Sequence, residues 1–382
     1  MSSLRRLGLG LVALGAIHAA PAQDLVPQYP RTLMIAYDPI IESEGAGRLH
    51  LVCGWNDPKL QSDAYSNDLQ TSSYGLMNYR RMQTIMADEF PIHTDGFRYT
   101  DEGYMACYYT WSGWHTTGND YKATCRDFDL ARKVDAGMID EVLIQAFPYT
   151  GYWESTMCGR GGYWCNSSPQ VRIASSKIFI MMGFNFERGV GEMLEDYGHR
   201  AESILSRTYG YGTNTWTIFT RYDLIYPGEA ACGNVHFAPN STADYQWGNP
   251  TFVWSTCQDW LDNFPNLTGA KVWVNCQEWG NGDMRAHHNW WFAHMPHVAG
   301  SLTEYNLTRL NNWWEYMQDF NSHTESGGDF PQSEEPPPAP PTRTAQRVYT
   351  DNDRDDWCPQ VSAGGRSEEH TSELQSQLTI SY

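Results

Sequence analysis

Short apolar runs separated by polar stretches recur along residues 24–323. The runs at residues 32–37, 49–53, 139–147 and 177–182 have the length and composition of strands. The run at 139–147 is expected to be a buried strand. Residues 24–323 contain no internal repeat, so we expect one main globular domain.

Three segments have helical spacing of their apolar positions, namely residues 127–134, 187–207 and 302–320. The clearest is 187–207, whose apolar side chains would share one face of a helix. These are Val190, Met193, Leu194, Tyr197, Ala201, Ile204 and Leu205. A helix, two strands and a second helix in this order predict an α/β fold, with a mixed, partly parallel sheet and flanking helices.

The two ends of the chain differ from the main domain in composition. Residues 1–22 combine Arg5 and Arg6 with an apolar run and a small-residue end, which predicts a signal peptide cleaved after Ala22. We therefore expect a secreted protein, extracellular or periplasmic. That apolar run is about eleven residues long, too short to span a bilayer, and no membrane anchor is expected.

The main domain is expected to cover residues 23–324 and to be followed by a proline-rich linker at 325–344. Residues 345–365 are interpreted as the truncated start of a second module. Asp351, Asp353 and Asp355 alternate there as the ligands of a calcium loop do, although a solvated acidic loop is the alternative. Residues 366–382 resemble a translated sequencing adapter and are left out of fold reasoning.

The charge balance is acidic, with 45 acidic against 26 basic residues and a net charge of −19. Such a surface repels phosphate backbones and anionic lipids, so neither a nucleic acid nor a membrane is expected as a partner. The chain also lacks a P-loop, a dinucleotide-binding glycine pattern and the GxSxG motif. Phosphate chemistry and serine-hydrolase chemistry are therefore disfavoured.

Nine cysteines follow the predicted signal peptide, and an oxidising compartment favours their pairing. The short separation of Cys158 and Cys165 predicts one disulfide, and Cys107 with Cys125 could form another. The fold is therefore expected to be disulfide-stabilised. Four sequons predict surface loops that could carry glycans, at Asn166, Asn240, Asn266 and Asn306.

Four ionisable residues, Glu192, Glu195, His199 and Glu202, share one face of the predicted helix 187–207, at positions i, i+3, i+7 and i+10. An imidazole with carboxylates one turn away can bind a divalent metal because the ligands project in parallel. The alternative is an ordinary Glu–His pair that only stabilises the helix. Since the other positions of this helix are heavily apolar, the polar stripe favours a site.

Residues 195–199 resemble, in spacing, the HExxH helix of zinc peptidases. The resemblance implies that Glu195 and His199 are metal ligands and that Asp196 stands at the general-base position. It departs from the family pattern because a carboxylate replaces the first histidine and Asp replaces the catalytic Glu. His199 and Glu202 are also similar to the HxxE pair of zinc carboxypeptidases.

A third ligand has to come from another segment, and we expect His236, in a loop rich in turn-forming residues. Asp244 could orient a ligating imidazole. Further candidates are His287, His288, His294 and His297. Together these residues predict a zinc-dependent or other metal-dependent hydrolase, of peptidase type, acting on an extracellular peptide or glycan. Its proton acceptor would be Asp196, Glu192 or Glu202.

A rival hypothesis rests on Glu154 and Glu187, which follow two predicted strands and are surrounded by aromatic residues. Two carboxylates and flat rings are what a glycosidase needs. A non-catalytic protein that binds carbohydrate or a surface is a third possibility. Residues 183–205 and 232–249 resemble segments of an uncharacterised family of secreted microbial proteins, and this resemblance implies no activity.

Overall fold

The computed structural model describes residues 25–209, 215–304, 307–323 and 348–349. The predicted signal peptide, linker, adapter segment and calcium ligands Asp351, Asp353 and Asp355 lie outside the described residues. The chain divides into two compact units. We call Pro30–Asp68 with Tyr79–Arg200 the sheet unit, to which strand β12 also belongs, and Leu69–Asn78 with Ala201–Gly328 the tryptophan unit.

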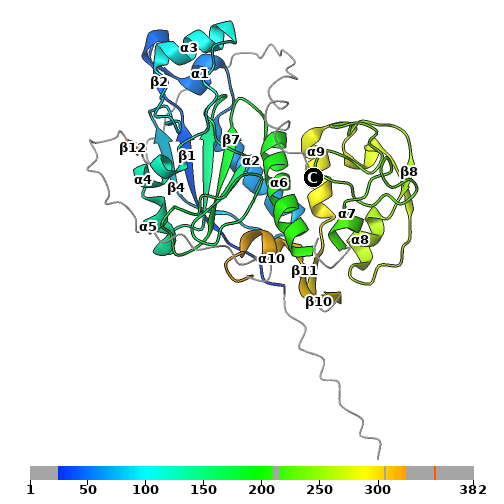
Figure 1. The fold of residues 1–382 in the computed structure, drawn as a ribbon. Coiled ribbons are helices and arrows are strands. Elements are labelled where there is room, and N and C mark those ends of the chain that lie inside the picture. Colours follow the sequence, from blue (N-terminus) through cyan, green and yellow to red (C-terminus); the bar gives the residue numbers. More distant parts are fainter. Residues whose placement is uncertain (1–24, 210–214, 305–306, 324–347, 350–382) are drawn as a thin grey trace, which may run out of the picture. The chain divides into compact units, whose positions relative to one another are not determined.

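The sheet unit is built on one six-stranded sheet with the strand order β12-β4-β1-β5-β7-β6 (Figure 1). Strands β4, β1, β5 and β7 are mutually parallel, whereas β6 and β12 pair antiparallel at the two edges. The strands are β1 (Arg31–Tyr37), β4 (Arg80–Ala87), β5 (Glu141–Ala146), β6 (Ser155–Cys158), β7 (Phe179–Asn185) and β12 (Val348–Tyr349). The predicted α/β fold with a mixed, partly parallel sheet is therefore confirmed.

The central strand β5 is buried at all six positions, so helices must cover both faces of the sheet. On one face, Gln145 donates to Ser62 Oγ of α2 (Pro58–Ser72) at 2.9 Å and to Met193 Sδ of α6 (Val190–Tyr209) at 3.7 Å. On the other face, Val142, Ile144 and Ala146 join the main hydrophobic core, which includes residues of α3 (Asp101–Thr110), α4 (Tyr121–Asp127) and α5 (Leu130–Asp135). Helices α2 and α6 thus cover one face of the sheet, and the shorter helices pack on the other.

Short helices connect the strands of the sheet unit, and one long helix follows β7. Their bounds are α1 (Leu49–Cys53), α2 (Pro58–Ser72), α3 (Asp101–Thr110), α4 (Tyr121–Asp127), α5 (Leu130–Asp135) and α6 (Val190–Tyr209). A small β2 (Ile40–Ile41) and β3 (Gly47–Arg48) pair beside the 3-10 turn η1 (Glu42–Glu44). Helix α6 is continuous, and the division between the two units falls within it, after Arg200.

The tryptophan unit has little regular sheet and is held together by aromatic side chains. Trp260, Trp279, Trp291, Trp313 and Trp314 are almost completely buried. Phe219 lies among them, with ring centroids 5.2 Å from Trp260 and 5.1 Å from Trp313. Its elements are α7 (Thr215–Phe219), β8 (Val253–Ser255), α8 (Cys257–Asn263), β9 (Val272–Val274), η2 (Cys276–Trp279), α9 (Met284–Ala293), β10 (His297–Glu304), β11 (Leu307–Asn312) and α10 (Trp313–Gln318).

Two predicted elements are wrong. Residues 49–53 form helix α1 and not a strand, and residues 302–320 form parts of the β10–β11 hairpin and helix α10 in place of one long helix. For residues 49–53 and 302–320, the spacing of apolar residues alone did not distinguish a helix from a strand. The predicted helix at 127–134 is divided between α4 and α5, and Asp129 between them has a φ of 55°.

The expected disulfide framework is also wrong, because all eight cysteines in the described residues are free. Cys158 and Cys165 lie against different faces of β6. The Cys165 sulfur is 3.5 Å from Ser155 Oγ, whereas Cys158 faces the core that contains Cys125. Side chains alternate along a strand, so residues 155 and 158 point to opposite faces. Hydrophobic burial stabilises this part of the fold without the predicted cross-links.

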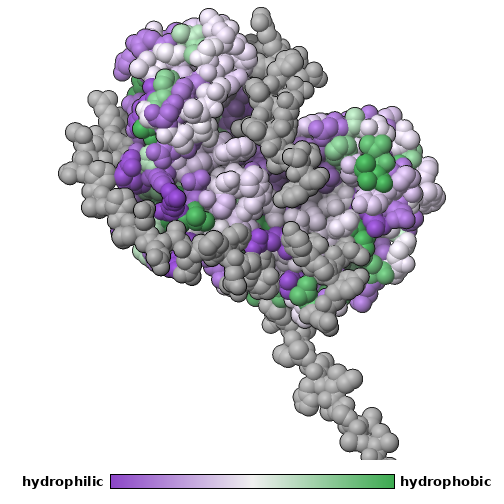
Figure 2. Space-filling view, viewed as in Figure 1, coloured by the Kyte–Doolittle hydropathy of each residue, from purple (hydrophilic) through white to green (hydrophobic). Residues whose placement is uncertain are grey.

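Two surface properties complete the description. Within the described residues, no helix is long and apolar enough to cross a membrane. On the face shown in Figure 2, hydrophobic residues are confined to small separate patches. Among the sequons, Asn266 is exposed, whereas Asn240 is buried and its amide donates to the carbonyls of Asn249 and Thr251. The predicted surface position of Asn240 is therefore wrong.

Candidate metal centre

Helix α6 begins with a side-chain cap that fixes its first turn. Glu192 Oε2 accepts the backbone N–H of Gly189 at 3.0 Å, and Glu192 Oε1 lies 3.5 Å from the guanidinium of Arg188. The first N–H groups of a helix have no partner within the helix, so a carboxylate three residues into it stabilises the helix start. Glu192 therefore has a positioning role in addition to any part in proton transfer, which remains a prediction.

One turn further, Glu195 and His199 face each other on the same side of α6. Their Oε1 and Nε2 atoms are 3.8 Å apart, and only 10% and 20% of the two side chains are exposed. The apolar face of α6 packs on the sheet through residues such as Met193 and Tyr197, which are buried. Helix periodicity alone therefore places both ligand candidates together, as predicted.

His236 stands on a tight turn in the tryptophan unit. Asn234 Oδ1 accepts the backbone N–H groups of His236 and Phe237 at 3.0 and 2.9 Å, which fixes the turn. Gly233 has a φ of 72°, and a Cβ there would lie 2.1 Å from the carbonyl oxygen of Phe237, so only glycine fits. The Asn234 side chain and Gly233 thus fix the backbone around His236, independently of the contacts of the imidazole.

Both ring nitrogens of His236 have partners. Nδ1 is 3.1 Å from Asp244 Oδ1, and Nε2 is 3.1 Å from the hydroxyl of Tyr245. A carboxylate on one nitrogen fixes the tautomer and leaves the lone pair on the other, as in zinc sites. The predicted orienting residue Asp244 is therefore in contact with the imidazole that it was expected to orient.

The second half of α6 contacts the turn that carries His236. Glu202 Oε1 accepts the backbone N–H of Val235, the residue before His236, at 3.3 Å. Glu195, His199 and His236 form a group in which one ligand atom from each lies within 4.8 Å of the others. The three residues predicted as metal ligands thus form a possible metal-binding group.

The surroundings of Glu195 are rich in negative charge. Burial raises the pKa of Asp196 well above its usual range, and the neighbouring carboxylates of Glu154 and Glu195 raise it further. Arg188 and His199 act in the opposite direction. Several carboxylates close to one guanidinium and one imidazole form a cluster that a divalent cation would neutralise.

Three of the four other histidine candidates, His288, His294 and His297, make hydrogen bonds to backbone carbonyls of the tryptophan unit, whereas neither ring nitrogen of His287 has a hydrogen-bond partner among the described residues. Buried His294 has its pKa lowered to about 4 by burial, and its Nδ1 is 2.7 Å from the carbonyl of Trp290. His288 Nε2 is 3.2 Å from the carbonyl of Val235, and His297 Nδ1 is 2.8 Å from that of Met295. His287 is completely buried, and burial lowers its pKa well below the usual range.

The rival pair, Glu154 and Glu187, has different neighbours. Glu154 accepts a hydrogen bond from Asn166 and is close enough to Asp196 to raise the pKa of that residue. Glu187 follows β7 and accepts a hydrogen bond from Asn185 Nδ2 at 3.4 Å. A glycosidase reaction by these two residues stays a prediction.

Sequence reasoning missed a buried Asp–His pair at the carboxyl end of β1. Asp38 accepts the backbone N–H of His50 at 3.0 Å, and its second oxygen is 2.7 Å from His50 Nδ1. The strand order changes direction at β1, where α/β folds commonly bind ligands. An aspartate directly after a predicted strand was the available signal. His50 could not be paired with it because residues 49–53 were expected to be a strand.

No family model, curated protein or solved structure matches this chain, so the comparisons with known proteins leave the site to be interpreted from its own geometry.

Proposed function

We propose that this protein is a secreted hydrolase that uses a divalent metal ion, with zinc as the ion that fits its donor set best. The observation that carries the proposal is the convergence of Glu195, His199 and His236. One carboxylate and two imidazoles form a donor set that occurs in catalytic zinc sites, which keep a further coordination position for water or substrate.

The fit of a cation is supported by charge as well as by donor type. Ligand atoms that share a zinc ion lie roughly 3 to 4 Å apart, and the 3.8 Å between Glu195 Oε1 and His199 Nε2 already meets this condition. With Asp244 holding Nδ1, His236 would exchange the contact of its Nε2 with the Tyr245 hydroxyl for the metal. Burial first, and then the carboxylates of Glu154 and Glu195, raise the pKa of Asp196, and a bound cation would reduce the second effect.

A metal ion bound by these residues would supply Lewis acidity and favour attack by water at neutral pH. The residues of the chain have separate tasks around it. Asp196 is next to Glu195 in the sequence and is the proposed proton acceptor for the attacking water. Glu202 holds the His236 turn through Val235, and Glu192 fixes the start of α6.

The proposed substrate is an extracellular peptide or glycan. The predicted signal peptide supports an extracellular or periplasmic location, and the acidic net charge of −19 makes a polyanionic substrate unfavourable. A secreted hydrolase of this kind would meet peptides and glycans outside the cell.

Metal analysis of the purified full chain is the direct experiment. We expect about one zinc per chain after dialysis against a metal-buffered solution, and loss of that metal in His199→Ala and His236→Ala. His115→Ala is the matched control, because His115 Nε2 contacts Asp95 at 2.9 Å and its side chain is 25% exposed, against 20% for His199. This control should keep its metal.

Hydrolysis of casein and of chromogenic glycosides should then be measured before and after removal of metal with a chelator. Activity that the chelator abolishes and zinc restores supports the proposal. The proposal is wrong if the wild-type protein binds no stoichiometric metal, or if His199→Ala retains it with normal affinity.

A further inference from the structure

Three aromatic side chains lie in the open on one face of the short hairpin β8–β9 of the tryptophan unit. Trp254 and Trp273 are directly opposite each other in the strand register, and Phe252 precedes Trp254 by two residues. Because side chains alternate along a strand, all three point to the same face. They are 41%, 52% and 50% exposed, in the order Phe252, Trp254 and Trp273. We call these three residues the aromatic platform.

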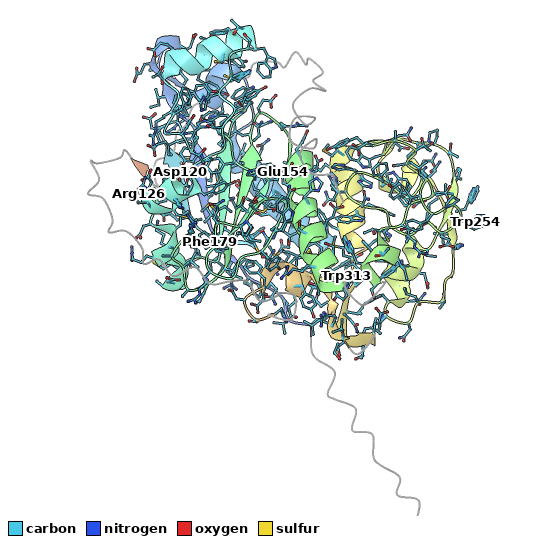
Figure 3. The ribbon with its side chains drawn as sticks, in the orientation of Figure 1. Asp120, Arg126, Glu154, Phe179, Trp254 and Trp313 are labelled. Carbon is cyan, nitrogen blue, oxygen red and sulfur yellow. The ribbon has the colours of Figure 1, made fainter. Side chains whose placement is uncertain are left out.

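The three rings contact one another, which fixes their arrangement. Phe252 and Trp273 have centroids 5.8 Å apart and ring planes within 4° of each other, and Trp254 and Trp273 have centroids 4.9 Å apart. Figure 3 shows Trp254 directed away from the rest of its unit. Cross-strand aromatic contacts of this kind stabilise a hairpin and reduce the freedom of the rings.

The opposite face of the hairpin attaches it firmly to the unit. Ser255 is completely buried and donates to the carbonyl of Ala231 at 2.7 Å, while Val274 is 4% exposed. Asn275 Nδ2 donates to the carbonyl of Pro250 at 3.0 Å. The platform is therefore mounted on a rigid base, and a ligand would meet rings that are already ordered. Preorganisation of this kind reduces the entropy lost on binding.

The exposure of these rings contrasts with the burial of most tryptophans in the same unit. Five other tryptophans are almost completely buried in the same unit. Burial of apolar surface stabilises a folded protein by roughly 25 cal/mol per square ångström, and exposed ring surface makes no such contribution. A cluster of large exposed rings therefore indicates a surface that is covered by a partner.

The chemistry of the platform favours a neutral polysaccharide as that partner. Residues 251–255 and 272–274 contain no ionisable side chain, so the platform offers no charge to a charged ligand. The net charge of −19 opposes nucleic acids and other polyanions, which would otherwise also stack on aromatic rings. Sugar rings carry C–H groups on their faces, and these groups pack on the negative face of an aromatic ring.

We propose that Phe252, Trp254 and Trp273 bind a neutral, chain-like carbohydrate by stacking of sugar rings on their exposed faces. Adjacent ring centroids about one sugar ring apart would allow successive sugars of a chain to contact successive rings. This binding is independent of the proposed metal centre and requires none of its residues.

Binding should be tested with the full chain and defined polysaccharides. The probes are insoluble cellulose and chitin in a pull-down experiment, and soluble β-glucan and xylan in affinity electrophoresis. We expect retention by at least one of these neutral polymers. In Trp254→Ala and Trp273→Ala, the dissociation constant should rise by about tenfold or more, which is the effect expected when a well-packed aromatic contact is lost.

Trp164→Ala is the matched control, because Trp164 is 49% exposed and lies outside the platform. It should bind as the wild type does. The thermal unfolding midpoint of each variant shows whether the fold is retained, and exposed positions make retention the expected result. Chelator treatment should leave binding unchanged, which separates this test from that of the metal centre.

Three results would overturn the proposal. The first is failure of the wild type to bind any of the four neutral polymers. The second is unchanged binding by both platform variants. The third is a concentration-dependent dimer in sedimentation velocity that Trp254→Ala abolishes, because the platform would then be covered by a second copy of the chain.

Discussion

Two acidic residues of the sheet unit, Glu141 on β5 and Asp196 on α6, have different surroundings. Glu141 of β5 accepts from Arg200 at 2.6 Å and from the hydroxyl of Tyr79 at 2.6 Å, and the side chains of Glu141 and Arg200 are 3% and 0% exposed. Asp196, one turn before Arg200, lies near Glu154 and Glu195 instead. The first carboxylate is compensated by a cation and a hydroxyl, whereas the second is surrounded by like charge.

This difference separates a structural charge on β5 from a candidate functional charge on α6. A buried ion pair with its hydrogen bonds made resists the loss of either partner, although it adds little net stability over an apolar pair. A carboxylate among like charges destabilises the folded protein at neutral pH. Clusters of carboxylates with shifted pKa values are typical of sites of proton transfer or cation binding.

The largest effect is expected on breaking the compensated pair. Arg200→Met or Glu141→Gln alone should lower the free energy of unfolding by about 3–5 kcal/mol, because one charged or polar group is left buried without its partner. The double variant Glu141→Leu/Arg200→Met should recover most of this loss. Urea unfolding of the three variants measures it, and single variants within about 1 kcal/mol of the wild type would contradict the assignment.

The opposite sign is expected for Asp196→Asn in the metal-free protein. The folded-state pKa of Asp196 is raised above that of the unfolded chain, so its favourable contribution exists at low pH and is lost as the pH rises through the folded-state pKa. The uncharged variant should therefore be more stable than the wild type at pH 7. The difference should disappear below about pH 4, near the unfolded-state pKa.

Thermal unfolding midpoints from pH 4 to pH 8, with a chelator present, test this prediction. A variant that is less stable than the wild type at pH 7 would show that Asp196 is held as an anion by a favourable partner. The contrast with Glu141 would then be lost.

The smallest effect is expected at Asp259 of α8, a buried carboxylate in the tryptophan unit. Burial alone would raise its pKa, but hydrogen bonds from Asn263, Thr268 and Gly269 outweigh burial and lower the pKa. Its contribution is therefore present above the unfolded-state pKa and lost as the pH falls through the folded-state pKa.

Asp259→Asn should reduce stability by about 1–2 kcal/mol at pH 7, because an amide cannot accept all of these hydrogen bonds. The difference from the wild type should shrink towards pH 3. Guanidinium unfolding at the two pH values is the measurement. An equal loss at both would indicate a packing effect and not a charge effect.

How far the sequence predicts this fold depends on the range of the interactions that decide each element. Strands β1, β5 and β7 and helix α6 have apolar patterns strong enough to be read locally, and each is found near its predicted position. Residues 302–320 have an apolar pattern as well, but β10 and β11 pair with each other there. These two strands are neighbours in the sequence, and the apolar spacing of residues 302–320 fits a helix while their cross-strand pairing forms a hairpin.

The candidate site shows the same limit. Glu195 and His199 could be grouped from the sequence because a helical turn brings residues four apart together. His236 was expected as the third ligand because of its turn-rich loop, with four other histidines as further candidates, and only the fold shows that it lies near Glu195 and His199. The Asp38–His50 pair was missed because α1 was read as a strand.

By itself, the sequence determined the α/β class, the long polar-faced helix and the acidic character of the chain, since these follow from composition and from local spacing. The tertiary structure decided which charges are compensated, which histidine joins Glu195 and His199, and that the described cysteines remain free. It also placed Trp254 and Trp273 in the open while it buried Trp313. A residue type is the same in either environment, and only the contacts made by distant parts of the chain decide which environment it has.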